Sequence, residues 1–142
     1  MNVVLRRSFA VAAFGWAAAL PLATWIASRP NARVVPYSFA FTVYGLGAWI
    51  CHQRPDRSFH LWTMQMPVCA RCTGIYVGAA IATLTTYVAR GRALLVAAAL
   101  PTVLTLAFEW ATGIAPSNVL RALAGVPLGA ALVWLALQAE VN

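Results

Sequence analysis

The residues of this chain that could do chemistry gather in one stretch, residues 51–72. It holds all three cysteines and both histidines: Cys51, His52, His60, Cys69 and Cys72. Cys69 and Cys72 have the spacing of two ligands on one metal ion, and Cys51 with either histidine would complete four. The stretch therefore predicts a site for zinc or another thiophilic metal ion. Three thiolates and an imidazole would close the coordination sphere, as in a structural site.

The same thiols allow two other interpretations. In the first, the chain is a membrane thiol–disulfide oxidoreductase, since a helix amino terminus near Cys69 and Cys72 would lower a thiol pKa. These two thiols would exchange electrons with quinone or with other thiols, and Cys51 would resolve the mixed disulfide. In the second, the protein is a metal-free scaffold or small carrier, and the thiols are small buried groups.

Polar residues accompany the cysteines or converge on them from later in the chain. Glu109 is costly in a membrane and needs a partner, for which Arg121 is the nearest candidate. The pair would serve as a proton or ion relay or as an ion pair between helices. Arg54, Arg57 and Arg71 would grip an anionic group or face lipid headgroups. The residues expected to line a pocket or to support the ligands are Arg54, Asp56, Arg57, Arg71, Glu109, Asn118 and Arg121.

The composition indicates that lipid surrounds the chain. The sequence is 62% hydrophobic and 9% charged, whereas soluble domains carry about 25% charged residues. The net charge of +7 comes from arginines that lie mostly near the ends of apolar runs, which suits phospholipid headgroups better than nucleic acid. We therefore expect membrane lipid as a partner and no nucleic acid, and the sequence identifies no protein partner.

Five apolar runs predict an all-α integral membrane bundle of about five transmembrane helices in a single domain, residues 1–142. The runs are 9–27, 34–50, 67–89, 93–112 and 119–138. A helix of about 20 residues crosses the hydrocarbon core. If the first run is a signal peptide that is removed, four helices remain. The loop with the cysteines and histidines joins the second and third helices, and residues 59–66 within it should form a hairpin or irregular interfacial segment.

Small residues predict one helix contact. Gly74, Gly78 and Ala82 recur every four positions, so they share a helix face that permits close backbone approach. The expected partner is the Gly125/Gly129 face of the last helix.

Five crossings would also place the amino terminus, the cysteine loop and the loop after residue 109 at one membrane face. Six arginines would then lie at that face and four at the other. The full count favours a cytoplasmic position for the cysteines, in a protein of the inner (plasma) membrane. Without Arg54, Arg57, Arg71 and Arg121, as possible site residues, the count reverses to two against four, and cysteines on the outer side would favour the redox interpretation. Thiols stay reduced in the cytoplasm, which favours the metal site over the redox interpretation.

Two segments resemble a known family. Residues 51–59, Cys-His-Gln-Arg-Pro-Asp-Arg-Ser-Phe, and residues 66–76, Met-Pro-Val-Cys-Ala-Arg-Cys-Thr-Gly-Ile-Tyr, resemble small prokaryotic membrane proteins grouped as domain of unknown function 2085. Glu109 and residues 117–125 resemble the second patch of that family, where aspartate often stands in the place of Glu109. The family usually has a glycine between the two halves of the motif, where this chain has Thr63 and Met64.

The resemblance covers roughly residues 40–135. It leaves the first helix and its loop, residues 1–33, outside a core of residues 34–138. It implies a multi-pass membrane protein and no established activity.

Overall fold

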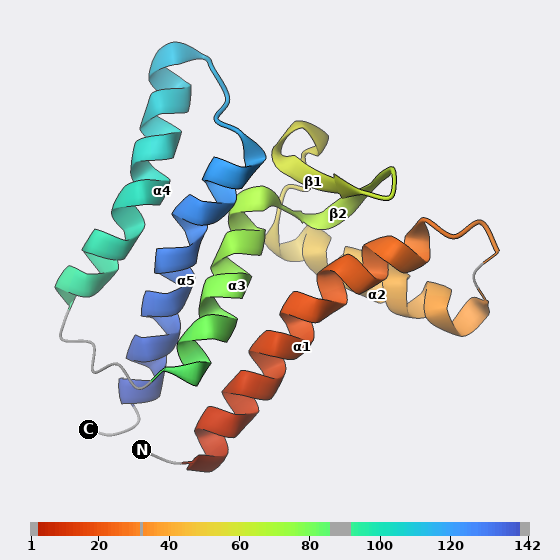
Figure 1. The fold of residues 1–142 in the computed structure, drawn as a ribbon, viewed down its shortest axis with the longest axis horizontal. Coiled ribbons are helices and arrows are strands. Elements are labelled where there is room, and N and C mark those ends of the chain that lie inside the picture. The colour runs from red at the N-terminus through yellow and green to blue at the C-terminus, as the bar shows by residue number, and fades with distance from the viewer. Residues whose placement is uncertain (1–2, 32, 86–91, 140–142) are drawn as a thin grey trace.

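Five helices and a short β-hairpin make up the structure, a computed structural model that describes residues 3–31, 33–85 and 92–139. The helices are α1 (Val3–Ala27), α2 (Val34–Ile50), α3 (Ala70–Leu84), α4 (Arg92–Thr112) and α5 (Asn118–Ala139). A 3-10 turn, η1 (Pro55–Arg57), leads into the strands β1 (Ser58–Leu61) and β2 (Met64–Cys69) (Figure 1). The predicted helical bundle is confirmed, and so is the position of the cysteine-bearing segment between α2 and α3.

Three helices in the described part of the chain are long and apolar enough to cross a membrane. They are the segments Arg6–Ala27, Ala93–Thr112 and Asn118–Leu137, while α2 and α3 are apolar but shorter. Large apolar side chains cover the outside of the bundle, and Trp49 and Trp110 are 93% and 81% exposed. An exterior of this kind is stable when lipid surrounds it.

The two small-residue faces meet as predicted, between α3 and α5. A Cβ atom on Gly78 would overlap the carbonyl oxygen of Val126, and one on Gly129 would overlap that of Ile75. Gly74 is equally close to the backbone of α5. These helices therefore touch backbone to backbone along most of α3, which fixes the position of its amino-terminal end.

The amino terminus lies at the opposite end of the bundle from the cysteines, so its predicted position is wrong. The Arg6 Nε atom donates to the carbonyl oxygen of Thr83 at 3.0 Å, near the carboxyl end of α3. Cys69 directly precedes the other end of α3. From Arg6, α1 runs antiparallel to α3 toward the hairpin, where Ile26 belongs to the same buried cluster as Val68.

The reason for this difference is α2. It turns back along the second half of α1 (Figure 1) and ends at Ile50, directly before Cys51. Gly47 packs directly against the carbonyl group of Pro67. The α2 helix therefore stays near the end of the bundle that carries the hairpin.

This arrangement exchanges arginines between the two ends. Arg6 and Arg7 leave the cysteine end, whereas Arg29 and Arg33, which follow α1, join it. The arginine count is unchanged by this exchange, with Arg90 outside the described residues. The cytoplasmic position of the cysteines therefore remains a prediction.

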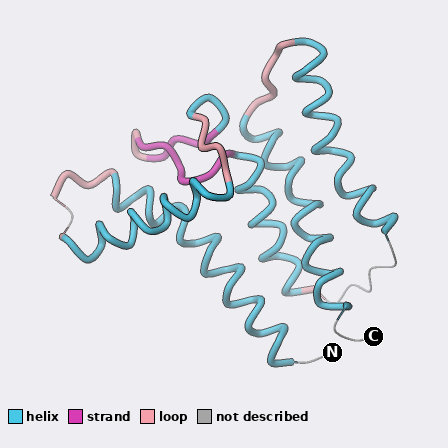
Figure 2. The backbone as a smooth tube through the Cα atoms, turned by 180° about the vertical axis from the view of Figure 1, so that it is seen from behind, coloured by secondary structure: helices cyan, strands magenta, loops and turns pink. Residues whose placement is uncertain are grey.

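Of the two forms expected for residues 59–66, a hairpin or an irregular segment, the hairpin is present, at this same end of the bundle (Figure 2). In its antiparallel register, His60 faces Gln65. The β2 strand continues through Cys69, so α3 begins at Ala70 rather than at residue 67. The predicted end of that helix near residue 89 lies outside the described residues. Two residues between the strands, Trp62 and Thr63, have left-handed φ angles of 50° and 68°.

Candidate metal centre

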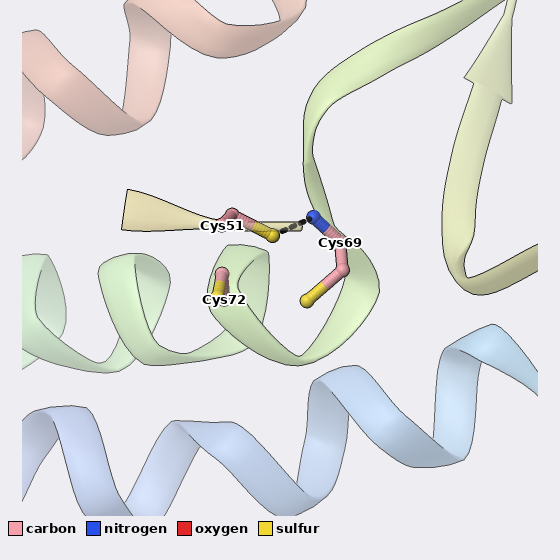
Figure 3. A group of neighbouring side chains, drawn as sticks. All are labelled: Cys51, Cys69 and Cys72. Atoms are coloured by element: carbon pink, nitrogen blue, oxygen red, sulfur yellow. Dashed lines mark hydrogen bonds between the residues drawn. The ribbon is translucent and has the colours of Figure 1, made fainter. Parts of the chain in front are cut away.

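The three cysteine sulfurs lie together where α2, β2 and α3 meet. Their Sγ atoms are all within 4.8 Å of one another, and none is in a disulfide bond. Cys51 caps the end of α2, Cys69 ends β2, and Cys72 lies in the first turn of α3 (Figure 3). The backbone N–H of Cys69 donates to the Cys51 sulfur at 3.1 Å. Cys51 is thus brought beside Cys69, 18 positions later in the sequence, and beside Cys72.

Two glutamines fix the backbone around this group, and the sequence analysis missed both. Gln53 has a left-handed φ of 46°. Its side-chain nitrogen donates to the carbonyl oxygens of Tyr44, at 2.9 Å, and Pro67, at 2.7 Å. The side chain of Gln65 in turn donates to the carbonyl oxygen of Gln53. The available signal was the position of Gln53, directly after the Cys51–His52 pair.

Hydrogen bonds to the Cys69 sulfur favour its thiolate form. The Cys72 thiol makes the largest contribution and, with the backbone N–H groups of Cys72 and Arg71 and the Cys51 thiol, lowers the pKa of Cys69 to about 5. Partial burial opposes this shift. Because a thiolate is the form that binds metal ions, Cys69 is ready for ligation at neutral pH.

The histidines lie outside the group of three sulfurs. His52 is exposed and lines the cavity beside the cysteines, whereas His60 is exposed on β1. Neither ring nitrogen belongs to the set of ligand atoms within 4.8 Å. A histidine as the fourth ligand therefore remains a prediction, and His52 is the one beside the site.

The predicted ion pair between Glu109 and Arg121 is present. The Glu109 Oε1 atom lies 3.2 Å from Arg121 and 2.6 Å from the guanidinium of Arg57. Glu109 is 8% exposed and Arg121 is 2% exposed. One carboxylate thus joins α4, α5 and the turn before β1. If either charge of this buried ion pair were removed, the other would be left buried and unpaired, which is strongly destabilising.

Asn118 completes this attachment of the loop to α5. Its side-chain nitrogen donates to the carbonyl oxygen of Ser58 at 2.9 Å, and its oxygen accepts from Arg121 at 3.3 Å. Arg121 also donates to the backbone carbonyl of Asp56 at 3.4 Å. We call Arg57, Glu109, Asn118 and Arg121 the Glu109 cluster.

A cavity of about 420 Å³ lies against the three cysteines. Its polar lining also includes His52, Arg54, Arg57 and Arg71. Asp56 lies outside this lining, on the exposed surface, where its carboxylate is 3.2 Å from Arg54. Apart from Asp56 and His60, the predicted site residues form two neighbouring groups, the cavity and the Glu109 cluster, and Arg57 belongs to both.

Comparison with known proteins places the site in a family. The model of a family described as predicted membrane protein (DUF2085) matches residues 51–135. The chain belongs to this family. The match begins at Cys51 and includes the hairpin, α3, α4 and most of α5, so it contains both groups of site residues. The α1 and α2 helices lie before it.

Two archaeal relatives match a shorter segment. An uncharacterised protein of Methanocaldococcus jannaschii is 53% identical over 36 residues, which are 25% of this chain and 23% of that protein. An uncharacterised protein of Methanothermobacter thermautotrophicus is 55% identical over 31 residues, 22% of this chain and 28% of that protein. The matched part thus spans about a quarter of each relative. No solved structure matches the chain.

Proposed function

We propose that this membrane protein binds one thiophilic metal ion, zinc, through the sulfurs of Cys51, Cys69 and Cys72. The observation that carries the proposal is the convergence of three free thiols within 4.8 Å. In a tetrahedral site with Zn–S bonds of about 2.3 Å, sulfurs lie about 3.8 Å apart. Small side-chain movements are therefore enough to bind the ion.

The surrounding charge supports three thiolate ligands. A divalent ion with three thiolates carries one net negative charge, which a low-dielectric site tolerates only beside positive charge. The arginines that line the cavity supply it. All three cysteines line the cavity, as does His52, so His52 or a small molecule from the cavity would supply the fourth ligand. This geometry supports a site with an exchangeable ligand more than the closed structural site expected from the sequence.

Metal analysis of the purified full-length chain tests the proposal. We expect about one zinc ion per chain in detergent, and cobalt substitution should give the intense visible bands of tetrahedral thiolate coordination. Each of Cys51→Ser, Cys69→Ser and Cys72→Ser should lose most of the ion. His60→Ala is the matched control and should retain it, while His52→Ala shows whether that imidazole is the fourth ligand.

Two results would contradict the metal site. Metal-free protein with a reversible Cys69–Cys72 disulfide would support the oxidoreductase, since vicinal thiols at a helix start suit exchange. Metal-free protein with inert thiols would leave the scaffold or carrier. Thiol titration beside the metal analysis separates these outcomes.

A further inference from the structure

The cavity beside the cysteines combines positive charge with apolar walls. Arg54, Arg57 and Arg71 line it, together with Ile50 and Ile75, and no acidic residue is among its described lining residues. Its volume of about 420 Å³ is within the range of small-molecule sites, roughly 300–1,000 Å³. The lining therefore favours a ligand with an anionic group.

The three arginines differ in how much of their charge is already used. Arg54 pairs with Asp56 at 3.2 Å, and Arg57 pairs with Glu109 at 2.6 Å. In the described part of the chain, Arg71 has no carboxylate within 4.0 Å, and its guanidinium donates to the hydroxyl of Thr105 at 3.3 Å. Arg71 is therefore the lining arginine whose charge no carboxylate offsets.

Arg71 also has an unused donor. Its Nε atom is shielded from solvent and lacks a hydrogen-bond partner in the described structure. A guanidinium has five N–H donors, and leaving one of them buried and unpaired destabilises the folded protein. An oxyanion that accepts two parallel hydrogen bonds from one guanidinium would remove this destabilisation.

The start of α3 adds to the positive potential. Arg71 is the second residue of that helix, whose amino-terminal end carries the positive end of the helix dipole. An incoming anion at this end would therefore meet the positive end of the helix dipole as well as the guanidinium of Arg71.

We propose that the cavity binds a phosphate group, with Arg71 as its principal contact and Arg54 and Arg57 at its sides. The phosphate is either free or the headgroup of a lipid, because Ile50 is itself exposed on the outside of the bundle. This site goes beyond the metal centre and does not require the ion.

Titration with inorganic phosphate tests the site on the full chain in a neutral detergent. We expect saturable binding in calorimetry, weakened about tenfold or more by Arg71→Gln, since charge-assisted hydrogen bonds contribute about 1.5–3 kcal/mol. Arg33→Gln is the matched control, because it removes one exposed arginine at the same end of the molecule, and it should leave binding unchanged. Equal weakening by both variants would overturn the proposal, since it would indicate unspecific attraction.

A second arm distinguishes the two sources of phosphate. The protein is reconstituted into phosphatidylcholine vesicles with or without phosphatidate, and co-purifying lipid is measured by native mass spectrometry. Retention of phosphatidate that depends on Arg71 would identify a lipid headgroup, whereas binding of inorganic phosphate alone would identify a free ligand. Binding of neither would overturn the site.

Controls for folding and for metal make these results decisive. Wild type and Arg71→Gln are compared only if their helix content and elution volume agree, and Arg71→Lys, which keeps the charge, should recover part of the affinity. Both arms are run on zinc-free and zinc-loaded protein. Because phosphate binding is expected in either state, failure to bind zinc would not decide this test.

Discussion

Two regions hold this molecule together by opposite means. Between α3 and α5 the contact depends on missing side chains, since Gly78 and Gly129 bring the two backbones together. At the hairpin end the contact depends on charged side chains, which meet on the Glu109 carboxylate. The first region is steric and apolar, and the second is electrostatic and specific.

The difference shows what each region can do in a membrane. Lipid tails are as apolar as the helix surfaces, so burying apolar groups between helices gains little free energy. Helices in a membrane associate through close packing instead. Such packing aligns α3 with α5 but does not hold a polar loop. Buried charges are costly, yet they bond only to particular partners. The Glu109 cluster therefore ties the loop that carries Cys51 and Cys69 to the bundle.

Removing the shared carboxylate should have the largest effect on stability. Glu109→Ala would leave the buried Arg121 without its ion-pair partner and would leave Arg57 with only Asp56, at 3.6 Å. We expect a loss of about 3–5 kcal/mol in the free energy of unfolding, measured by denaturant titration in detergent micelles. The hairpin should detach first, so any bound metal would be lost as well.

Asp56→Ala is the control for this variant. It also removes a carboxylate next to Arg54 and Arg57, but from an exposed ion pair, which should contribute little. If Glu109→Ala and Asp56→Ala were equally stable, the buried cluster would not be what attaches the hairpin.

Adding a single methyl group at the α3–α5 contact should reduce stability by less than the loss of the Glu109 carboxylate. A Cβ at position 78 would overlap the Val126 carbonyl, so Gly78→Ala must separate the helices, at about 1–3 kcal/mol in the same titration. Gly45→Ala places the same group where no atom lies within 4 Å. Alanine favours the helix there, so we expect that variant to be neutral or slightly stabilising. If Gly78→Ala and Gly45→Ala changed the free energy of unfolding in the same direction, the close contact at Gly78 would be contradicted.

Most of both regions could be predicted from the sequence, because each shows a pattern that can be recognised within a single helix. Glycines repeating every four residues indicate one face of a helix, and a lone glutamate in an apolar run needs a cation. These rules led to the α3–α5 contact and to the Glu109–Arg121 pair. The second partner, Arg57, is 52 positions before Glu109, and no local pattern joins them.

The misplaced amino terminus has a different cause. Strict alternation of crossings assumes that every apolar run crosses the membrane, and hydrophobicity alone cannot separate a crossing helix from one that packs beside a loop. The packing of Gly47 on Pro67 decides against a return crossing. That contact depends on the fold of the hairpin, so it follows from tertiary structure rather than from the pattern of α2.

A substitution in the hairpin, Thr63→Gly, should have the smallest effect of the three, and it should increase stability. Trp62 and Thr63 both have positive φ angles between the two strands, the backbone of a two-residue turn that favours glycine or asparagine. A β-branched residue such as Thr63 is strained there. Thr63→Gly should therefore stabilise the hairpin by about 0.5–1 kcal/mol, the relief of strain being partly offset by the greater freedom of the unfolded chain.

Hydrogen exchange of the amides in β1 and β2 measures this gain directly. The exchange of these amides should slow in Thr63→Gly, while exchange along α3 and α5 should not change. Thr42→Gly, at an exposed helical position of α2, is the control and should be destabilising, because glycine is unfavourable in a helix. Faster exchange of the hairpin in Thr63→Gly would mean that the threonine side chain stabilises the turn more than its backbone strains it. The hairpin would then depend on side-chain contacts, as the Glu109 cluster does.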